Sequence, residues 1–367
     1  MERRKFLSNI VGPSLISIAP FSNKASYLST LSKEDDPTNC DYAPPGEYIK
    51  DQTFVFTDGW WHLFSISGTR GYYHGYNGNE ETFSWSVSKN LVDWEFRGHV
   101  MHPSLRKGTY DQHEVWAPFC MKAGDKFYMF YTGVVHPHRP MEYRKLGHQH
   151  PFDGKGHKET QGMAVSNDLT DWVKVDDPVN GLGIPGRDSN VVRDEENDRW
   201  LLYSTGKGQI VNGEPRDEVY ISQSADLLNW KFMGTCALFP KLDTTRNFGR
   251  TVDSWEGFKK EAGTTESMVI KKHPLNNKWI MMGNWQYALS GDPTNFMKSE
   301  VNYYDNTFKG KRVDLGFACE VVHHNNKWYR TSTVGDRDYW RLAFTEIEWV
   351  KDGAFRIVKP GRPNSLY

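Results

Sequence analysis

The sequence has almost no net charge and no cysteine motif for metal binding. Its 45 lysine and arginine residues are balanced by 46 aspartate and glutamate residues, so the formal net charge is −1. Binding to nucleic acid requires clustered basic residues that neutralise phosphates, and this balance argues against such a partner. The cysteines lack the CxxC and Cys/His spacings of zinc sites. They are Cys40, Cys120, Cys236 and Cys319. No disulfide pairing follows from their positions.

The N-terminus also lacks a segment that could span a membrane. The apolar run at residues 10–21 is too short to cross a bilayer, and it follows the paired basic residues Arg3 and Arg4. Paired arginines before a weakly apolar run resemble a twin-arginine export signal. The alternative is a basic N-terminus without structure. We expect residues 1–25 to be an export signal, and the protein to be periplasmic or secreted with no membrane partner.

After residue 48 no amphipathic pattern of helical length is present, and short strand–turn–strand units recur instead. In residues 184–203, apolar strands around Val191 and at 200–203 flank a polar turn, which is typical of a β-hairpin. Similar hairpins recur along the chain, each opened by an acidic residue. These acids are Asp51, Glu114, Asp188, Glu266 and Glu320.

A second element follows several of these hairpins and has the pattern Ser-x-Asp/Asn-Leu-x-x-Trp. Its copies end at Trp94, Trp172 and Trp230. Each copy predicts a strand, a tight turn and a further strand, so each unit has four strands. Repeated four-stranded units predict an all-β, five-bladed β-propeller over residues 48–367. Residues 26–47 are expected to be a linker or a segment that wraps the surface.

The first strand of each propeller blade lines the central channel, so the five acids are expected to converge on one funnel. Grouped carboxylates raise one another's pKa, which is useful for acid catalysis. A single acid at a blade start could instead accept hydrogen bonds from backbone N–H groups, but the joint pattern favours a site. Glu114 and Glu320 are either such structural acceptors or ligands of sugar hydroxyls.

Together these features resemble the glycoside hydrolases of family 43 and their relatives in families 32, 68 and 117. The resemblance rests on motifs at successive blade starts, namely Lys50-Asp51, Trp116-Ala117-Pro118, Arg187-Asp188 and Glu266-Ser267. It implies that Asp51 is the general base, that Asp188 orients and tunes the acid, and that Glu266 is the general acid. Glycosidic cleavage needs such a pair, with one protonated carboxyl and one carboxylate on opposite faces of the sugar.

The sequence departs from these families at several positions. Gln52, Ser189 and Ser267 stand where a proline usually follows the acids. Residues 316–320 lack the Gly-His that supports a central metal in family 43, so we expect no cofactor and a central calcium is not supported. The first blade lacks the Asn-Asp-Pro-Asn of family 32, so fructan specificity is not supported. Family 117, which acts on agar-derived oligosaccharides, is a plausible neighbour.

Further candidates for sugar binding lie beside the acids or in less regular stretches. They are His113, Glu114, Trp116, Arg187, Trp255, Trp285, Glu320 and Arg337. The three tryptophans suit either sugar stacking or the core. The His-rich insertion at residues 136–157 is either a metal site or a loop at the mouth of the funnel, and its irregular spacing favours the loop.

Two functions of different class follow from the sequence. The first is an exported, exo-acting and inverting glycoside hydrolase that acts on oligosaccharides from plant or algal polysaccharides. The second is a carbohydrate-binding propeller without turnover. A retaining glycosidase like those of family 32 is a variant of the first. A phosphorylase would need a phosphate pocket, for which Arg250 and Arg337 are the candidates. Retention of all three acids favours hydrolysis, and the sequence favours no oligomeric state.

Overall fold

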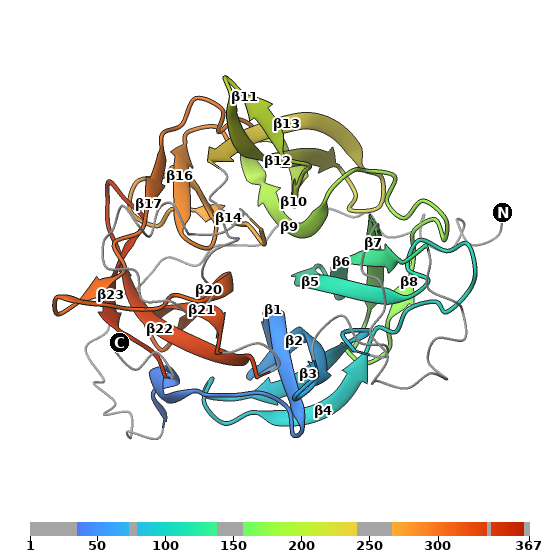
Figure 1. The fold of residues 1–367 in the computed structure, drawn as a ribbon, viewed down its shortest axis with the longest axis horizontal. Coiled ribbons are helices and arrows are strands. Elements are labelled where there is room, and N and C mark those ends of the chain that lie inside the picture. The colour runs from blue at the N-terminus through green and yellow to red at the C-terminus, as the bar shows by residue number, and fades with distance from the viewer. Residues whose placement is uncertain (1–34, 73–78, 138–156, 241–265, 336–338, 363–367) are drawn as a thin grey trace. The chain divides into compact units, whose positions relative to one another are not determined.

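The computed structural model describes residues 35–72, 79–137, 157–240, 266–335 and 339–362. These residues form five large β-sheets arranged around one axis, as Figure 1 shows, and one two-stranded sheet. The prediction of a five-bladed β-propeller from the repeated hairpins is therefore confirmed. The described ranges contain no α-helix. No helix in them is long and apolar enough to cross a membrane.

Each blade is an antiparallel sheet whose four main strands follow chain order. Blade 1 contains β1 (Glu47–Thr57), β2 (Trp60–Thr69), β3 (Thr82–Ser88) and β4 (Glu95–Val100), and blade 2 contains β5 (Glu114–Ala123), β6 (Lys126–Val135), β7 (Lys158–Ser166) and β8 (Val173–Lys174). Blade 3 contains β9 (Arg187–Asp194), β10 (Arg199–Thr205), β12 (Glu214–Ser224) and β13 (Lys231–Pro240), with β11 (Gln209–Val211) beside β12. Blade 4 contains β14 (Val269–Lys272), β15 (Trp279–Met282), β16 (Gln286–Ser290) and β17 (Val301–Tyr303). The small hairpin β18 (Thr307–Phe308) and β19 (Lys311–Arg312) precedes blade 5, which contains β20 (Phe317–His324), β21 (Lys327–Val334), β22 (Arg341–Trp349) and β23 (Phe355–Lys359).

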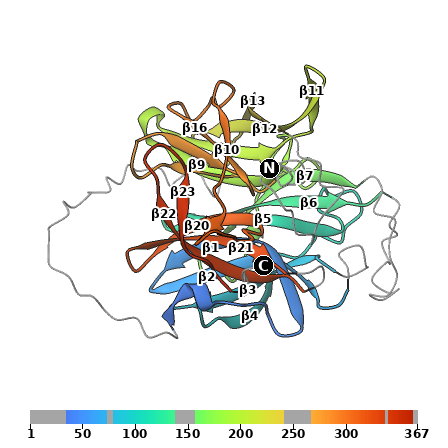
Figure 2. The same cartoon turned by 60° about the vertical axis from the view of Figure 1, so that its left-hand side comes forward.

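The innermost strands are β1, β5, β9, β14 and β20 (Figure 1). Each of them contacts the next around the ring, and β20 contacts β1. The first and last blades therefore lie side by side, as Figure 2 also shows. Gln52 joins them from within, because its amide donates to the Ala318 carbonyl at 2.5 Å and accepts from the Thr333 hydroxyl at 2.8 Å. The Ile49 N–H adds a bond to the Trp340 carbonyl at 3.1 Å.

The Ser-x-Asx-Leu-x-x-Trp repeats form one turn in three blades. In blade 2, Ser166 Oγ accepts from the N–H groups of Asp168 (3.1 Å) and Leu169 (2.9 Å). The Asp168 carboxylate accepts from the Asp171 N–H at 2.9 Å, and the Trp172 indole donates to the Leu169 carbonyl at 3.0 Å. The copies in blades 1 and 3 make matching bonds. The motif thus encodes the turn that leads into each fourth strand.

The segment before blade 1 packs on blade 5. It contains the 3-10 turn η3 (Pro37–Asn39), and the backbone of Tyr42 pairs with that of Leu342. Cys40 is buried in the same apolar cluster as Leu342. All four cysteines are buried free thiols.

Candidate active site

A kink in the inner strand of every blade shapes the centre of the molecule. One residue in or beside each inner strand has a positive φ: Asp51 (50°), Ala117 (47°), Asp188 (55°), Ser267 (49°) and Ala318 (52°). In four of the blades the pairing register shifts at this place, as a β-bulge requires. A bulge interrupts the alternation of side chains, so the kinked residue and the residue before it can face the same side. The side chains of Arg187 and Asp188 do so, with Nε 3.6 Å from Oδ2.

Only two of these five equivalent positions carry an acid, namely Asp51 and Asp188. Glu266 lies one residue before the kink of its blade, Glu114 three residues before and Glu320 two residues after. The prediction that the five acids occupy equivalent positions in their blades is therefore wrong, because only two of them lie at the kink. The residue types along a strand do not reveal where a bulge shifts its register.

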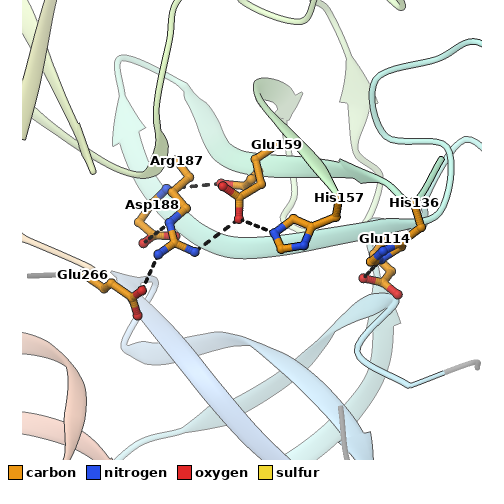
Figure 3. Close-up of polar contacts among 8 residues, drawn as sticks. Glu114, His136, His157, Glu159, Arg187, Asp188 and Glu266 are labelled. Atoms are coloured by element: carbon orange, nitrogen blue, oxygen red, sulfur yellow. Dashed lines mark hydrogen bonds and ion pairs between the residues drawn. The ribbon is translucent and has the colours of Figure 1, made fainter. Parts of the chain in front are cut away.

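Asp51, Asp188 and Glu266 nevertheless share one site. Arg187 contacts Asp188 and Glu266 (Figure 3), and its charge also acts on Asp51. The guanidinium of Arg187 contacts the Glu266 carboxylate directly. Asp51 interacts electrostatically with Arg187 and Glu266, and its carboxylate accepts a hydrogen bond from Ser267. The Glu266 side chain is 40% exposed and that of Asp188 only 12%, so Glu266 lies nearest to solvent.

The charges of this cluster are strongly coupled. Burial raises the pKa of Asp188 to about 7, with Arg187 opposing the rise and the Glu266 and Asp51 carboxylates adding to it. Burial also raises the pKa of Asp51, against the charge of Lys50 and with that of Glu266. The Asp188 carboxylate raises the pKa of Arg187, so the guanidinium stays charged. Near neutral pH the site can therefore hold a proton beside a permanent cation.

Two further residues of the site, Glu159 and His157, were not predicted from the sequence. Glu159 Oε1 lies 3.2 Å from Arg187 Nη1 and 3.1 Å from His157 Nε2 (Figure 3). Burial works against ionisation of Glu159, but the hydrogen bond from His157 and the charge of Arg187 lower its pKa. The His157 ring packs edge-on against Trp116, with centroids 5.4 Å apart. The available signal was a charged residue near the start of β7, four residues before its apolar part.

His113 and Glu114 lie behind this site and not in it. Glu114 is 1% exposed, and its carboxylate is 2.9 Å from His136 Nε2 (Figure 3). His113 is fully buried, and its Nδ1 accepts from the backbone N–H of His136 at 3.0 Å. This burial favours the structural alternative for Glu114, and for His113 it favours the alternative of supporting a nearby acid over contact with a substrate. His113 and Glu114 both precede the kink of β5 at Ala117, and both are buried within blade 2.

Glu320 lies near Asp51 and Asp188 in the channel. All three border a cavity of about 30 Å³, which has room for a water molecule or two. Burial raises the pKa of Glu320 to about 7 against the charge of Lys271. Glu320 is therefore a half-buried channel residue whose carboxyl can hold a proton near neutral pH.

The remaining candidates fall into two groups. Trp116 precedes the kink of blade 2, and Trp285 lies between β15 and β16, and both are half-buried. The neighbouring Asn284 accepts from the Ala318 N–H at 2.8 Å, which places this connection near the channel. Trp255, Arg250 and Arg337 lie outside the described residues, as do residues 1–25 and most of the insertion at 136–157.

A central calcium ion would have to be held by residues of the channel. Among the described residues, no group of three or more His, Cys, Asp or Glu side chains could hold a metal ion. The carboxylate of Glu320 already has the buried ammonium of Lys271 as its cationic neighbour, and this ammonium donates to the Val321 carbonyl at 2.9 Å. A second cation would have to compete with it.

The fold is shared with solved propeller enzymes. A thermostable family-43 glycoside hydrolase is 18% identical, with a TM-score of 0.58 over 86% of this chain and 94% of that chain. A family 32 β-fructofuranosidase from Bombyx mori is 17% identical, with a TM-score of 0.53 over 89% of this chain and 66% of that chain. At these identities the similarity establishes the fold alone.

Sequence comparison identifies the family. A sucrose-6-phosphate hydrolase from Pediococcus pentosaceus is 34% identical over 84 residues, which are 22% of this chain and 15% of that protein. The chain thus matches about one seventh of the length of this relative. The sequence model described as the glycosyl hydrolases family 32 N-terminal domain matches residues 42–248, more than half of the chain. The chain therefore belongs to glycosyl hydrolase family 32, through its match to the N-terminal domain of that family.

Proposed function

We propose that the protein is a glycoside hydrolase in which Asp51 is the general base, Glu266 the general acid and Asp188 the carboxyl that tunes the acid. The observation that carries this proposal is the grouping of these three carboxyls around Arg187 at the propeller centre. Family membership supports the reaction class. In the reaction, Asp51 takes a proton from water as the water attacks the anomeric carbon. Glu266 gives a proton to the leaving oxygen.

The positions of the acids suit these roles. The Glu266 side chain is 40% exposed, against 12% for Asp188, so Glu266 can reach a leaving group that points to solvent. Asp188 interacts electrostatically with both other carboxyls, and its raised pKa provides a proton near Glu266 at neutral pH. We infer an inverting mechanism from the resemblance to family 43, whereas membership of family 32 favours a retaining one. The carboxyls of base and acid stand roughly 6.5 to 9.5 Å apart in an inverting enzyme, against roughly 5 to 5.5 Å in a retaining enzyme.

The charges described around the triad favour an uncharged oligosaccharide as substrate. Lys50 and Arg187 both contact carboxylates, so neither is available as a phosphate ligand. This weighs against a phosphorylase and against a phosphorylated sugar, although one sequence relative is named a sucrose-6-phosphate hydrolase. A mutant of the Bombyx mori enzyme has been solved in complex with sucrose, so this fold accepts an uncharged disaccharide. We propose exo-action on oligosaccharides of plant or algal origin, without a resident metal and after export.

The test begins with a panel of oligosaccharides and aryl glycosides. Glu266→Gln should lower kcat/KM by about 10²–10⁴-fold on substrates with poor leaving groups and much less on activated aryl glycosides, because only the former need protonation. An equal loss on both would argue against the acid role.

The anomeric configuration of the product tests the base. Asp51→Asn should abolish activity on both substrate classes, and NMR of the wild-type product should show inverted configuration. A retained configuration would assign Asp51 as a nucleophile instead. Binding without hydrolysis of any member of the panel would indicate a carbohydrate-binding propeller.

A further inference from the structure

Both aspartates at kinked positions are directly preceded by a cation. Lys50 precedes Asp51 in blade 1, and Arg187 precedes Asp188 in blade 3. Each cation also contacts a glutamate near the start of a third strand. Arg187 contacts Glu159 on β7, and Lys50 contacts Glu80, two residues before β3. An aspartate, a cation and a second carboxylate thus occur together twice around the channel, with the glutamate in the same blade as Lys50 but in the blade before that of Arg187.

The ammonium of Lys50 is held firmly from behind. Its Nζ lies 2.7 Å from Glu80 Oε2, and the two side chains are 17% and 1% exposed. The hydroxyl of Tyr48 donates to the other oxygen of Glu80 at 2.7 Å, and the Asn79 amide donates to this hydroxyl at 3.2 Å. The Trp340 ring lies 5.4 Å from the ammonium. This network is buried, so it restricts Lys50 to one place beside the channel.

On the channel side, the ammonium of Lys50 interacts electrostatically with the carboxyl of Asp51. Burial would lower the pKa of Lys50, but the carboxylates of Glu80 and Asp51 outweigh it and raise this pKa, so Lys50 stays charged. For Asp51, Lys50 is the largest influence that opposes the rise of the pKa on burial. The other charged groups that face Asp51 are Glu266 and Arg187 from blades 4 and 3, together with Asp188.

We propose that Lys50 is a positioning residue, whose ammonium is fixed by Glu80 and holds the adjacent Asp51 carboxyl in place as a carboxylate. The assignment of Asp51 as the base rests on the proposed function, whereas the effect of Lys50 on Asp51 does not. The two cations are placed differently, because Arg187 contacts three carboxylates of the site, whereas the only ion pair of Lys50 among the described residues is with Glu80, behind the channel. The charge of Lys50 therefore acts on Asp51 from one fixed position.

The test compares Glu80→Gln with the double variant Lys50→Met/Glu80→Gln. Replacing Lys50 alone would leave the buried Glu80 without its cation and could prevent folding. In the pair, Glu80→Gln keeps an acceptor for Tyr48, and the double variant then removes only the ammonium. Thermal melting checks that both variants fold.

The probe is the protein itself, labelled with ¹³C at the aspartate carboxyls and titrated by NMR, with Asp51→Asn assigning the Asp51 signal. Loss of the ammonium should raise the Asp51 midpoint by about 1 to 3 pH units relative to Glu80→Gln. Lys50→Arg should keep the midpoint near that of the wild type. An unchanged or lower midpoint in the double variant would overturn the proposal.

Activity provides a second readout. On any oligosaccharide that the wild type hydrolyses, the acidic limb of kcat/KM should move to higher pH by the same amount as the NMR midpoint. A shifted midpoint in a protein that hydrolyses no member of the panel would support the role of Lys50 and contradict the proposed function. Hydrolysis with an unmoved midpoint and acidic limb would contradict the role of Lys50 alone.

Discussion

Arg187 is the residue on which the charges of the site depend. It contacts Asp188, Glu266 and Glu159, and it directly precedes one of them in the chain. Because one guanidinium cannot neutralise three carboxylates, each carboxyl receives only part of its charge. This sharing, with burial, allows the pKa of Asp188 to stand at about 7 despite an adjacent cation.

Glu159→Gln tests this sharing. The change removes one negative charge near Asp188 and leaves more of the Arg187 charge for Asp188 and Glu266, so the pKa of Asp188 should fall from about 7. Because Asp188 then loses its proton at a lower pH, the basic limb of the pH profile of kcat/KM should move to lower pH. Carboxyl NMR and the pH profile measure the two effects.

The matched control is Glu195→Gln, because Glu195 is 83% exposed on η5 (Glu195–Asn197), at the other end of β9. It should change neither the NMR midpoint nor the pH profile. A midpoint of Asp188 that stays or rises in Glu159→Gln would show that Glu159 does not draw charge from Arg187.

At the scale of the strands, one short turn recurs and determines where each fourth strand begins. Its leucine has φ between 64° and 69° in all three copies, and it is at most 3% exposed. Leucine is costly in this backbone region, and the serine and aspartate or asparagine compensate by accepting the turn's N–H groups.

Ser166→Ala should therefore destabilise the protein by about 1 to 3 kcal/mol, because the buried N–H of Leu169 loses its acceptor. Urea denaturation followed by fluorescence measures the change. Asn167→Ala, at the exposed neighbouring position, is the control and should stay within about 0.5 kcal/mol of the wild type. Equal losses in both variants would contradict the role of the serine.

At the scale of the whole ring, closure depends on contacts between the first and last blades. Gln52 provides buried ones, since it is 3% exposed and bonds to Ala318, Thr331 and Thr333. It stands where related enzymes carry a proline, and a proline could not make these bonds.

Gln52→Leu keeps most of the side-chain volume but leaves these blade 5 groups without their partner. We expect a loss of about 2 kcal/mol or more in the free energy of unfolding, measured by chemical denaturation. Gln209→Leu, on the exposed strand β11, should change it by less than about 0.5 kcal/mol. A similar stability of both variants would show that other contacts close the ring.

The sequence by itself determined the fold and the identity of the three central carboxyls. Strand alternation and the Ser-x-Asx-Leu turn are local patterns, so they can be read without knowledge of distant contacts. Their repetition predicts five blades, and blade order places the kink of β1, the start of β9 and the residues before β14 in one channel. Asp51, Asp188 and Glu266 accordingly lie together.

Only the tertiary structure decided which acids face the channel and what surrounds them. The β-bulges displace Glu114 and Glu320 from the positions of Asp51 and Asp188, and a bulge depends on pairing with a second strand. Glu159 and Glu80 reach Arg187 and Lys50 from 28 and 30 residues away in the chain, across strands whose distance no local pattern encodes. The same holds for the burial of His113 beneath His136. Charge sharing in the site depends on these distances, because electrostatic energy varies with separation and burial and not with order in the sequence.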